Sequence, residues 1–110
     1  MPTSYQLDPA AHEELVAAMA WYDTEVDGLG LAFLEEFHAV AQRAARFPES
    51  GTPIDGSPID TPIRRFVFKR FKHAIYALTV DGTLLIFAVA HQHQRPGYWR
   101  KRLRRASRSR

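Results

Sequence analysis

The chain has 110 residues, of which 45% are hydrophobic and 25% charged, which suits one folded domain and excludes a wholly disordered protein. The absence of cysteine excludes disulfide bonds, a thiol nucleophile and a thiolate metal site. The apolar runs at 15–22 and 84–90 are too short to span a membrane, and the first residues show no export-signal pattern, so we expect a cytoplasmic protein with no membrane partner.

Charge is divided between the two halves of the chain, although the formal net charge is only +3. Residues 1–60 carry eleven acidic and two basic side chains, whereas residues 61–110 carry one acidic and thirteen basic side chains. A basic half of this kind attracts polyanions or an acidic segment of another protein. The alternative interpretation is that the two halves neutralise each other within the folded domain.

The first half of the chain predicts a short strand followed by two helices. A possible strand at 4–7 ends at Asp8, a typical N-cap, and the next residue is a proline suited to the first helical position. Apolar residues recur at helical spacing up to about Val26, and again in a second helix that stops at Pro48. Because the link between these amphipathic segments contains two glycines, they predict a helical hairpin.

The second half of the chain predicts a loop and three strands. Four prolines and two glycines within 48–62 predict an irregular surface loop. Strands rich in Phe, Val, Ile and Tyr follow at 63–68 and 74–80, and a two-residue Asp-Gly turn joins the second of them to Thr83–His91. That last strand is apolar on both faces, which is typical of a central strand.

The predicted order of elements is therefore β-α-α-β-β-β, an α+β fold. We expect one domain over 1–103, with the helical hairpin packed on one face of a mostly antiparallel sheet, because that arrangement buries the apolar stripes of both helices. Residues 104–110 are predicted to form a disordered basic tail.

The first group of candidate binding residues consists of Arg64, Arg65, Lys69, Arg70 and Lys72, interleaved with three phenylalanines. Side chains alternate between the two faces of a strand, so Arg64 and Arg65 are expected on opposite faces. The group is either a stripe that binds polyanions, with aromatic stacking, or a strand whose cations protect an edge while its phenylalanines enter the core.

The second group begins at the end of the last predicted strand. His91 and His93 share one side of an extended chain, which suits a metal ion, but no third ligand is available and we predict no metal site. A histidine here can act as a general acid or base, with Arg95 or Arg102 stabilising a phosphate and Tyr98 close by. Alternatively, His91 is a hydrogen-bonded residue at the end of a central strand.

Aromatic side chains outside the strands have both functional and structural interpretations. Trp99 is large enough to fold back over the core as a lid. Trp21 and Tyr22 on the first predicted helix mark a partner surface if they are exposed, although the apolar stripe of the helix favours a core position for Tyr22.

The sequence lacks the motifs of the common hydrolases. It has no glycine-rich phosphate loop, no GxSxG elbow and no HExxH. The adjacent pairs Glu13-Glu14 and Glu35-Glu36 lie on the predicted helices and are typical of solvated helix faces. We therefore do not expect a hydrolase of the usual kinds, assign no catalytic residue and predict no cofactor.

Several motifs follow one another in an order that is typical of a known family. They are Trp21-Tyr22, Gly30, Phe33, Arg64-Arg65, Phe71, Ala88-Val89-Ala90-His91, Pro96-Gly97-Tyr98-Trp99-Arg100 and Arg102. In this order, over residues 5–103, the chain resembles the RelE/ParE superfamily, the toxins of type II toxin–antitoxin pairs.

The resemblance implies a compact sheet with the helical hairpin on one side and a partner antitoxin whose segment wraps the toxin. It also implies binding to operator DNA only together with that antitoxin. RelE-like members cleave messenger RNA on the ribosome, whereas ParE-like members block DNA gyrase and are not nucleases. The Tyr98-Trp99 ending and the Trp21-Tyr22 pair resemble the ParE side.

We therefore expect a ParE-like toxin of the plasmid-stabilisation type that inhibits DNA gyrase. Its predicted target-binding residues are Arg64, Arg65, His91, Arg95, Tyr98, Trp99 and Arg102. Its antitoxin is expected to carry an acidic segment, because the second half of the toxin is strongly basic. Family members commonly have two consecutive arginines before Pro96, where this chain has His93-Gln94 and then Arg95, which weakens or shifts a contact there.

Two alternatives stay open. A RelE-like, ribosome-dependent mRNA endoribonuclease would draw on Arg64, Lys69, Arg95 and Tyr98, whose spacing matches the nuclease pattern poorly, so no catalytic residue is assigned. The other alternative is a non-toxic module that binds any polyanion, in which case its binding weakens steeply with salt.

Overall fold

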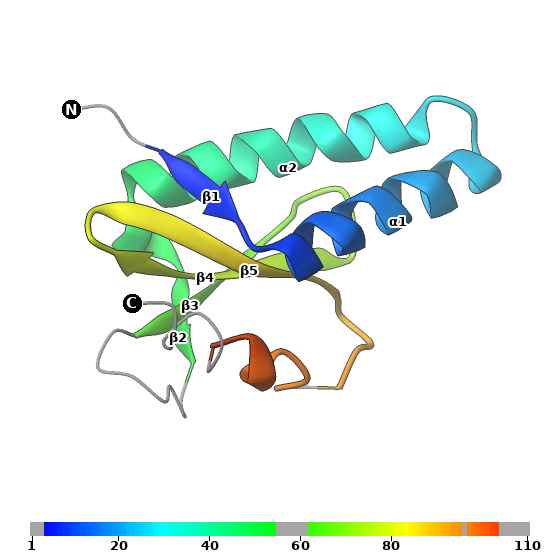
Figure 1. Ribbon diagram of the computed structural model, residues 1–110. Coiled ribbons are helices and arrows are strands. Elements are labelled where there is room, and N and C mark those ends of the chain that lie inside the picture. The colour runs from blue at the N-terminus through cyan, green and yellow to red at the C-terminus, as the bar shows by residue number, and fades with distance from the viewer. Residues whose placement is uncertain (1–3, 55–61, 96, 104–110) are drawn as a thin grey trace.

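Two helices cover one face of a five-stranded sheet in the computed structural model, which describes residues 4–54, 62–95 and 97–103 (Figure 1). The elements are β1 (Tyr5–Leu7), α1 (Pro9–Glu25), α2 (Leu29–Arg46), the 3-10 helix η1 (Pro48–Ser50), β2 (Thr52–Ile54), β3 (Ile63–Val67), β4 (His73–Val80) and β5 (Thr83–His91). The strand order is β1-β5-β4-β3-β2, and β1 with β5 is the one parallel pair among the described strands. The predicted α+β fold is confirmed, while the predicted tail at 104–110 lies outside the described residues.

The helical hairpin follows the capping signals of the sequence. The Asp8 carboxylate accepts a hydrogen bond from the Ala10 N–H at 3.0 Å, and α1 begins at Pro9. Gly28 precedes α2 with a φ of 84°, a left-handed conformation that glycine adopts without steric cost. In the described part of the chain, neither helix has the combination of length and apolar character that a membrane span requires.

The segment 48–62 is more regular than its prolines and glycines predict. It contains η1 and also β2, which pairs antiparallel with β3 at the edge of the sheet. Pro53 sits within β2 opposite Arg64. An edge strand tolerates proline because one side of its backbone has no partner strand, so proline content alone was a poor guide here. Residues 55–61 lie outside the described residues.

The sheet separates two apolar clusters. On the helix side, Phe33 and Phe37 of α2 pack with residues of β4 and β5 such as Ile75 and Ile86. On the other side, Trp99 and Leu103 pack with a smaller set of residues from β3, β4 and β5. Residues beyond β5 therefore cover the face that the helices leave open, and their helical turn is the red element in Figure 1.

A β-bulge at Phe87 divides β5 into two parts. The register pairs Ala77 with Ile86 and Tyr76 with Ala88, so Phe87 has no partner in β4. Ile86 belongs to the helix-side cluster, whereas Phe87 and Ala88 both belong to the opposite cluster. The extra residue at the bulge shifts the alternation of β5 by one position. Beyond Phe87, side chains and backbone groups therefore point in directions opposite to those that an unbroken strand would give.

We expect Gly30→Ala to destabilise the protein by about 1–3 kcal/mol, although alanine is the better helix former. An added Cβ would lie 2.5 Å from the Met19 carbonyl oxygen and 2.8 Å from Oδ2 of Asp23, whose other carboxylate oxygen accepts a hydrogen bond from the Gly30 N–H. Urea denaturation checks this, with Ala39→Gly at an exposed position of α2 as the control for helix propensity alone. Increased stability of Gly30→Ala would contradict the close approach of the two helices.

Candidate functional site

Residues 94, 95 and 97–103, called here the C-terminal segment, pack against the sheet through Trp99. The Trp99 ring centroid lies 5.0 Å from that of Phe87 and 5.2 Å from that of Tyr76. The Trp99 side chain is 2% exposed, as expected of a side chain that folds back over the core. Of the predicted target-binding residues, Trp99 therefore anchors the segment and presents little surface to a partner.

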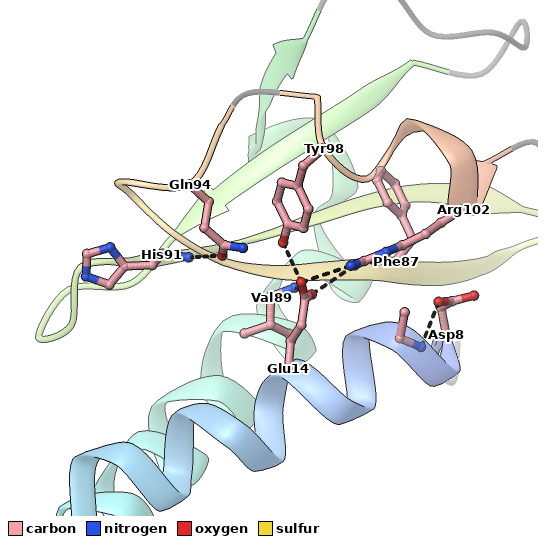
Figure 2. A network of polar contacts seen from close by, with 9 residues as sticks. Asp8, Glu14, Phe87, Val89, His91, Gln94, Tyr98 and Arg102 are labelled. Atoms are coloured by element: carbon pink, nitrogen blue, oxygen red, sulfur yellow. Dashed lines mark hydrogen bonds and ion pairs between the residues drawn. The ribbon is translucent and has the colours of Figure 1, made fainter.

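Glu14 of α1 joins the C-terminal segment to β5 (Figure 2). Arg102 donates hydrogen bonds to both carboxylate oxygens of Glu14, at 2.9 and 3.0 Å. The Tyr98 hydroxyl donates to one of these oxygens at 2.7 Å, and the Val89 N–H donates to the other at 2.9 Å. The Arg102 and Glu14 side chains are 18% and 19% exposed, so this bidentate ion pair is largely shielded from water.

Tyr98 and Arg102 are protonated at neutral pH in any environment, and the network makes both groups harder to deprotonate. Burial, followed by the hydrogen bond to Glu14, raises the pKa of the Tyr98 hydroxyl, and the hydrogen bond to Glu14 raises the pKa of Arg102. Glu13 is exposed, as a solvated helix face predicts, but that prediction is wrong for Glu14. Its three partners lie at least 75 residues away in sequence, so no local signal identified it.

A basic cleft of about 320 Å³ opens beside the C-terminal segment. Its lining residues are Arg65, Val67, Phe68, Phe71, Lys72, His73, Ala74, Tyr76, Ala90, His91, Gln92, Gln94, Arg95, Tyr98 and Trp99. None of these described residues is acidic, so Arg65, Lys72 and Arg95 give the cleft a positive potential above a partly aromatic floor.

The structure divides the predicted target-binding residues between several places. Arg65, His91, Arg95, Tyr98 and Trp99 all line the basic cleft. The two remaining residues lie elsewhere, Arg102 in the network with Glu14 and Arg64 beside a second cavity of about 230 Å³.

Arg64 and Arg65 face different surroundings, as strand alternation predicts. The Arg64 guanidinium donates hydrogen bonds to the carbonyl oxygens of Gly51, at 2.8 Å, and Glu49, at 3.3 Å. Arg64 thus ties β3 to the segment before β2, whereas Arg65 lines the basic cleft. The set proposed for a nuclease, which combines Arg64 with Arg95 and Tyr98, is not gathered at one cavity.

Two imidazoles, those of His73 and His91, line the basic cleft, and the ring of His93 stacks on that of His91. The ring centroids of His73 and His91 are 5.0 Å apart, as are those of His91 and His93. Burial, reinforced by the neighbouring His91, lowers the pKa of His73 to about 4, although Glu14 acts in the opposite direction. Burial also lowers the pKa of His91, assisted by His93 and Lys72, so both rings are neutral at pH 7. No group of three or more metal-ligating side chains occurs among the residues that the structure describes.

Of the other cleft residues, Lys72 belonged to the first group of candidate binding residues but not to the predicted target-binding set, and His73 belonged to neither. His73 pairs with His91 across β4 and β5 because the bulge at Phe87 shifts by one residue the register that the predicted two-residue turn would set. The carbonyl of Lys72 accepts a hydrogen bond from the Gln92 N–H at 3.0 Å. The turn before Lys72 is held from α2, because the Glu36 carboxylate accepts hydrogen bonds from the N–H groups of Lys69 and Arg70.

A scan of the chain against models of known protein families gives no match, and a search of the curated proteins gives no match either. The functional conclusions below therefore rest on the sequence motifs and on the geometry of the basic cleft.

Proposed function

We propose that this protein is the toxin of a type II toxin–antitoxin pair, that it acts in the cytoplasm, and that it blocks DNA gyrase in the manner of ParE-like toxins. A cognate antitoxin with an acidic segment neutralises it, and the two together bind operator DNA. The observation that carries the proposal is the basic cleft, in which three cations and no described carboxylate surround a partly aromatic floor.

The chemistry of the cleft favours an acidic protein segment as its occupant. Arg65 and Arg95 offer planar guanidinium groups that bind carboxylates bidentately, and Lys72 adds a third positive charge. The apolar side chains of the floor allow such a segment to bury nonpolar surface at the same time. In this proposal gyrase and the antitoxin compete for the same cleft, which accounts for neutralisation.

We expect the double variant Arg65→Gln, Arg95→Gln to lose the growth arrest that follows induction of the parent protein in bacteria without its antitoxin. Pulse labelling after induction of the parent is expected to show an early fall in DNA synthesis, ahead of any fall in protein synthesis. The matched control is Arg43→Gln, Arg46→Gln, which removes two exposed cations from α2 and should leave the arrest intact. Persistent arrest in the cleft variant would contradict the assignment of the cleft.

A second candidate function, ribosome-dependent cleavage of messenger RNA, is favoured by the neutral imidazoles at the cleft. Nδ1 of His91 accepts a hydrogen bond from the His93 N–H at 3.1 Å, so His91 takes a proton from a 2′-hydroxyl only if that contact opens, while Lys72 and Arg95 stabilise the charge of the phosphate. Mapping of transcript ends after induction distinguishes the two functions. Cuts at regular codon positions would support the nuclease, and intact messages would exclude it. Salt-sensitive binding to any nucleic acid, without growth arrest, would instead indicate a polyanion-binding module.

A further inference from the structure

The edge of β5 beyond the bulge is closed by side chains instead of a strand. β1 pairs only with Leu84–Ile86, which leaves the remainder of that edge without a partner strand among the described elements. Three backbone groups there form hydrogen bonds of 2.9 Å with side chains. Arg102 donates to the Phe87 carbonyl, the Val89 N–H donates to Glu14, and the His91 N–H donates to the Gln94 side chain (Figure 2).

Glu14 is the residue at which these contacts meet. Each of its two carboxylate oxygens accepts two hydrogen bonds, one oxygen from Val89 and Arg102 and the other from Tyr98 and Arg102. A carboxylate with four donors fixes the position of each donor group, because charge-assisted hydrogen bonds are short and directional. Glu14 therefore fixes the C-terminal segment relative to both α1 and β5.

The C-terminal segment is also one wall of the basic cleft, to which it contributes Gln94, Arg95, Tyr98 and Trp99. The near end of this wall is attached to β5 through the hydrogen bond between Gln94 and His91. Its far end is attached through Tyr98 and Arg102 to Glu14. The location of Arg95 in the cleft thus depends on contacts at both ends of the wall.

We propose that Glu14 is a positioning residue for the basic cleft. Glu14 holds the C-terminal segment on the open edge of β5, and this sets the positions of Arg95 and Tyr98. Glu14 itself is absent from the lining of the cleft, so it acts through the segment and not by touching the occupant. The effect on growth arrest rests on the proposed function, whereas the effect on the position of the segment does not.

A spectroscopic test uses the two tryptophans of the chain. In a Trp21→Phe background, Trp99 is the one remaining tryptophan, and its burial in the folded protein makes acrylamide quenching of its fluorescence slow. Glu14→Gln places an amide N–H₂ group beside the Arg102 donors and is expected to raise the quenching constant several-fold while far-UV circular dichroism stays unchanged. Glu13→Gln, at the adjacent exposed position, should leave quenching as in the parent. Equal quenching in both variants would overturn the proposal.

A second comparison separates positioning from general loss of stability. Val40→Ala in the helix-side core lowers the thermal unfolding midpoint without touching the C-terminal segment, and we expect no change in Trp99 quenching. At Arg102, lysine keeps a charged donor group, whereas glutamine has only an uncharged amide. The quenching constant should therefore rise from the parent through Arg102→Lys to Arg102→Gln. A rise in Val40→Ala equal to that in Glu14→Gln would show that the role of Glu14 is only structural.

The functional part is tested by induction of the same variants in cells. Growth arrest should weaken in Glu14→Gln and persist in Glu13→Gln and Val40→Ala at equal amounts of folded protein. If the parent causes no arrest while Glu14→Gln still frees Trp99, the proposed function fails and the positioning role stands. If the parent arrests growth and Glu14→Gln arrests it equally, the positioning role fails and the proposed function stands.

Discussion

Replacing Trp99 by alanine is expected to destabilise the protein by about 3–5 kcal/mol, the cost of emptying a large buried site in a small domain. The ring lies against Phe87 and Tyr76 and belongs to the same apolar cluster as Leu103. Among the residues that the structure describes, that cluster is the smaller of the two and holds six buried residues, so few neighbours can collapse into the space. Denaturation in urea, read by circular dichroism, measures the difference in free energy of unfolding.

The matched control is the other tryptophan. Trp21 is 57% exposed on α1, and Trp21→Ala should cost below about 1 kcal/mol. Trp99→Phe keeps an aromatic ring in the cluster and should fall between Trp99→Ala and the parent. Equal costs at Trp99 and Trp21 would show that the C-terminal segment contributes little to the fold.

The protein is expected to lose stability as the pH falls from 6.5 to about 4, with His73 as a main cause. Its pKa is about 4 in the folded state and 6.5 without the fold, because burial and the neighbouring His91 disfavour the charged ring, against the opposite effect of Glu14. The unfolded chain therefore binds a proton at His73 in this window while the folded protein does not. One proton corresponds to at most about 1.4 kcal/mol per pH unit, and partial solvent exposure of the ring reduces the slope.

Urea denaturation at a series of pH values between 4 and 6.5 measures this slope. His73→Gln should flatten it, because the titrating group is removed. His12→Gln is the matched control, since His12 is exposed on α1 and should leave the slope unchanged. A His73→Gln variant with the slope of the parent would mean that other groups, such as His91, carry the whole dependence.

Local patterns predicted most elements of the fold. The Asp-Gly turn between β4 and β5 forms where expected, with φ values of 50° at Asp81 and 80° at Gly82. The N-cap at Asp8 and the break at Gly28 bound the two helices as predicted. Each of these features depends on a few consecutive residues, and for that reason it can be predicted from one sequence alone.

The features that define the site depend on long-range contacts and on one local irregularity. Glu14 contacts residues at least 75 positions away, and the pairing of His73 with His91 depends on the bulge at Phe87, which the predicted turn does not specify. Tyr98 and Arg102 are residue types typical of binding surfaces, yet both side chains donate hydrogen bonds to Glu14 and so hold the C-terminal segment in place. Composition therefore predicted a basic region but could not separate the side chains that line the cleft from those that hold the C-terminal segment in place.

The span of the Glu14 network has a consequence for the kinetics of folding. Glu14 and Arg102 are 88 residues apart in sequence, and β1 with β5 joins similarly distant segments. The helical hairpin and the β4–β5 hairpin are local and can form first, because short loops close at lower entropic cost. Contacts that form after the transition state change the rate of unfolding more than the rate of folding. We therefore expect the ion pair between Glu14 and Arg102 to contribute mainly to the lifetime of the folded state, and with it to the time for which the wall of the basic cleft stays in place.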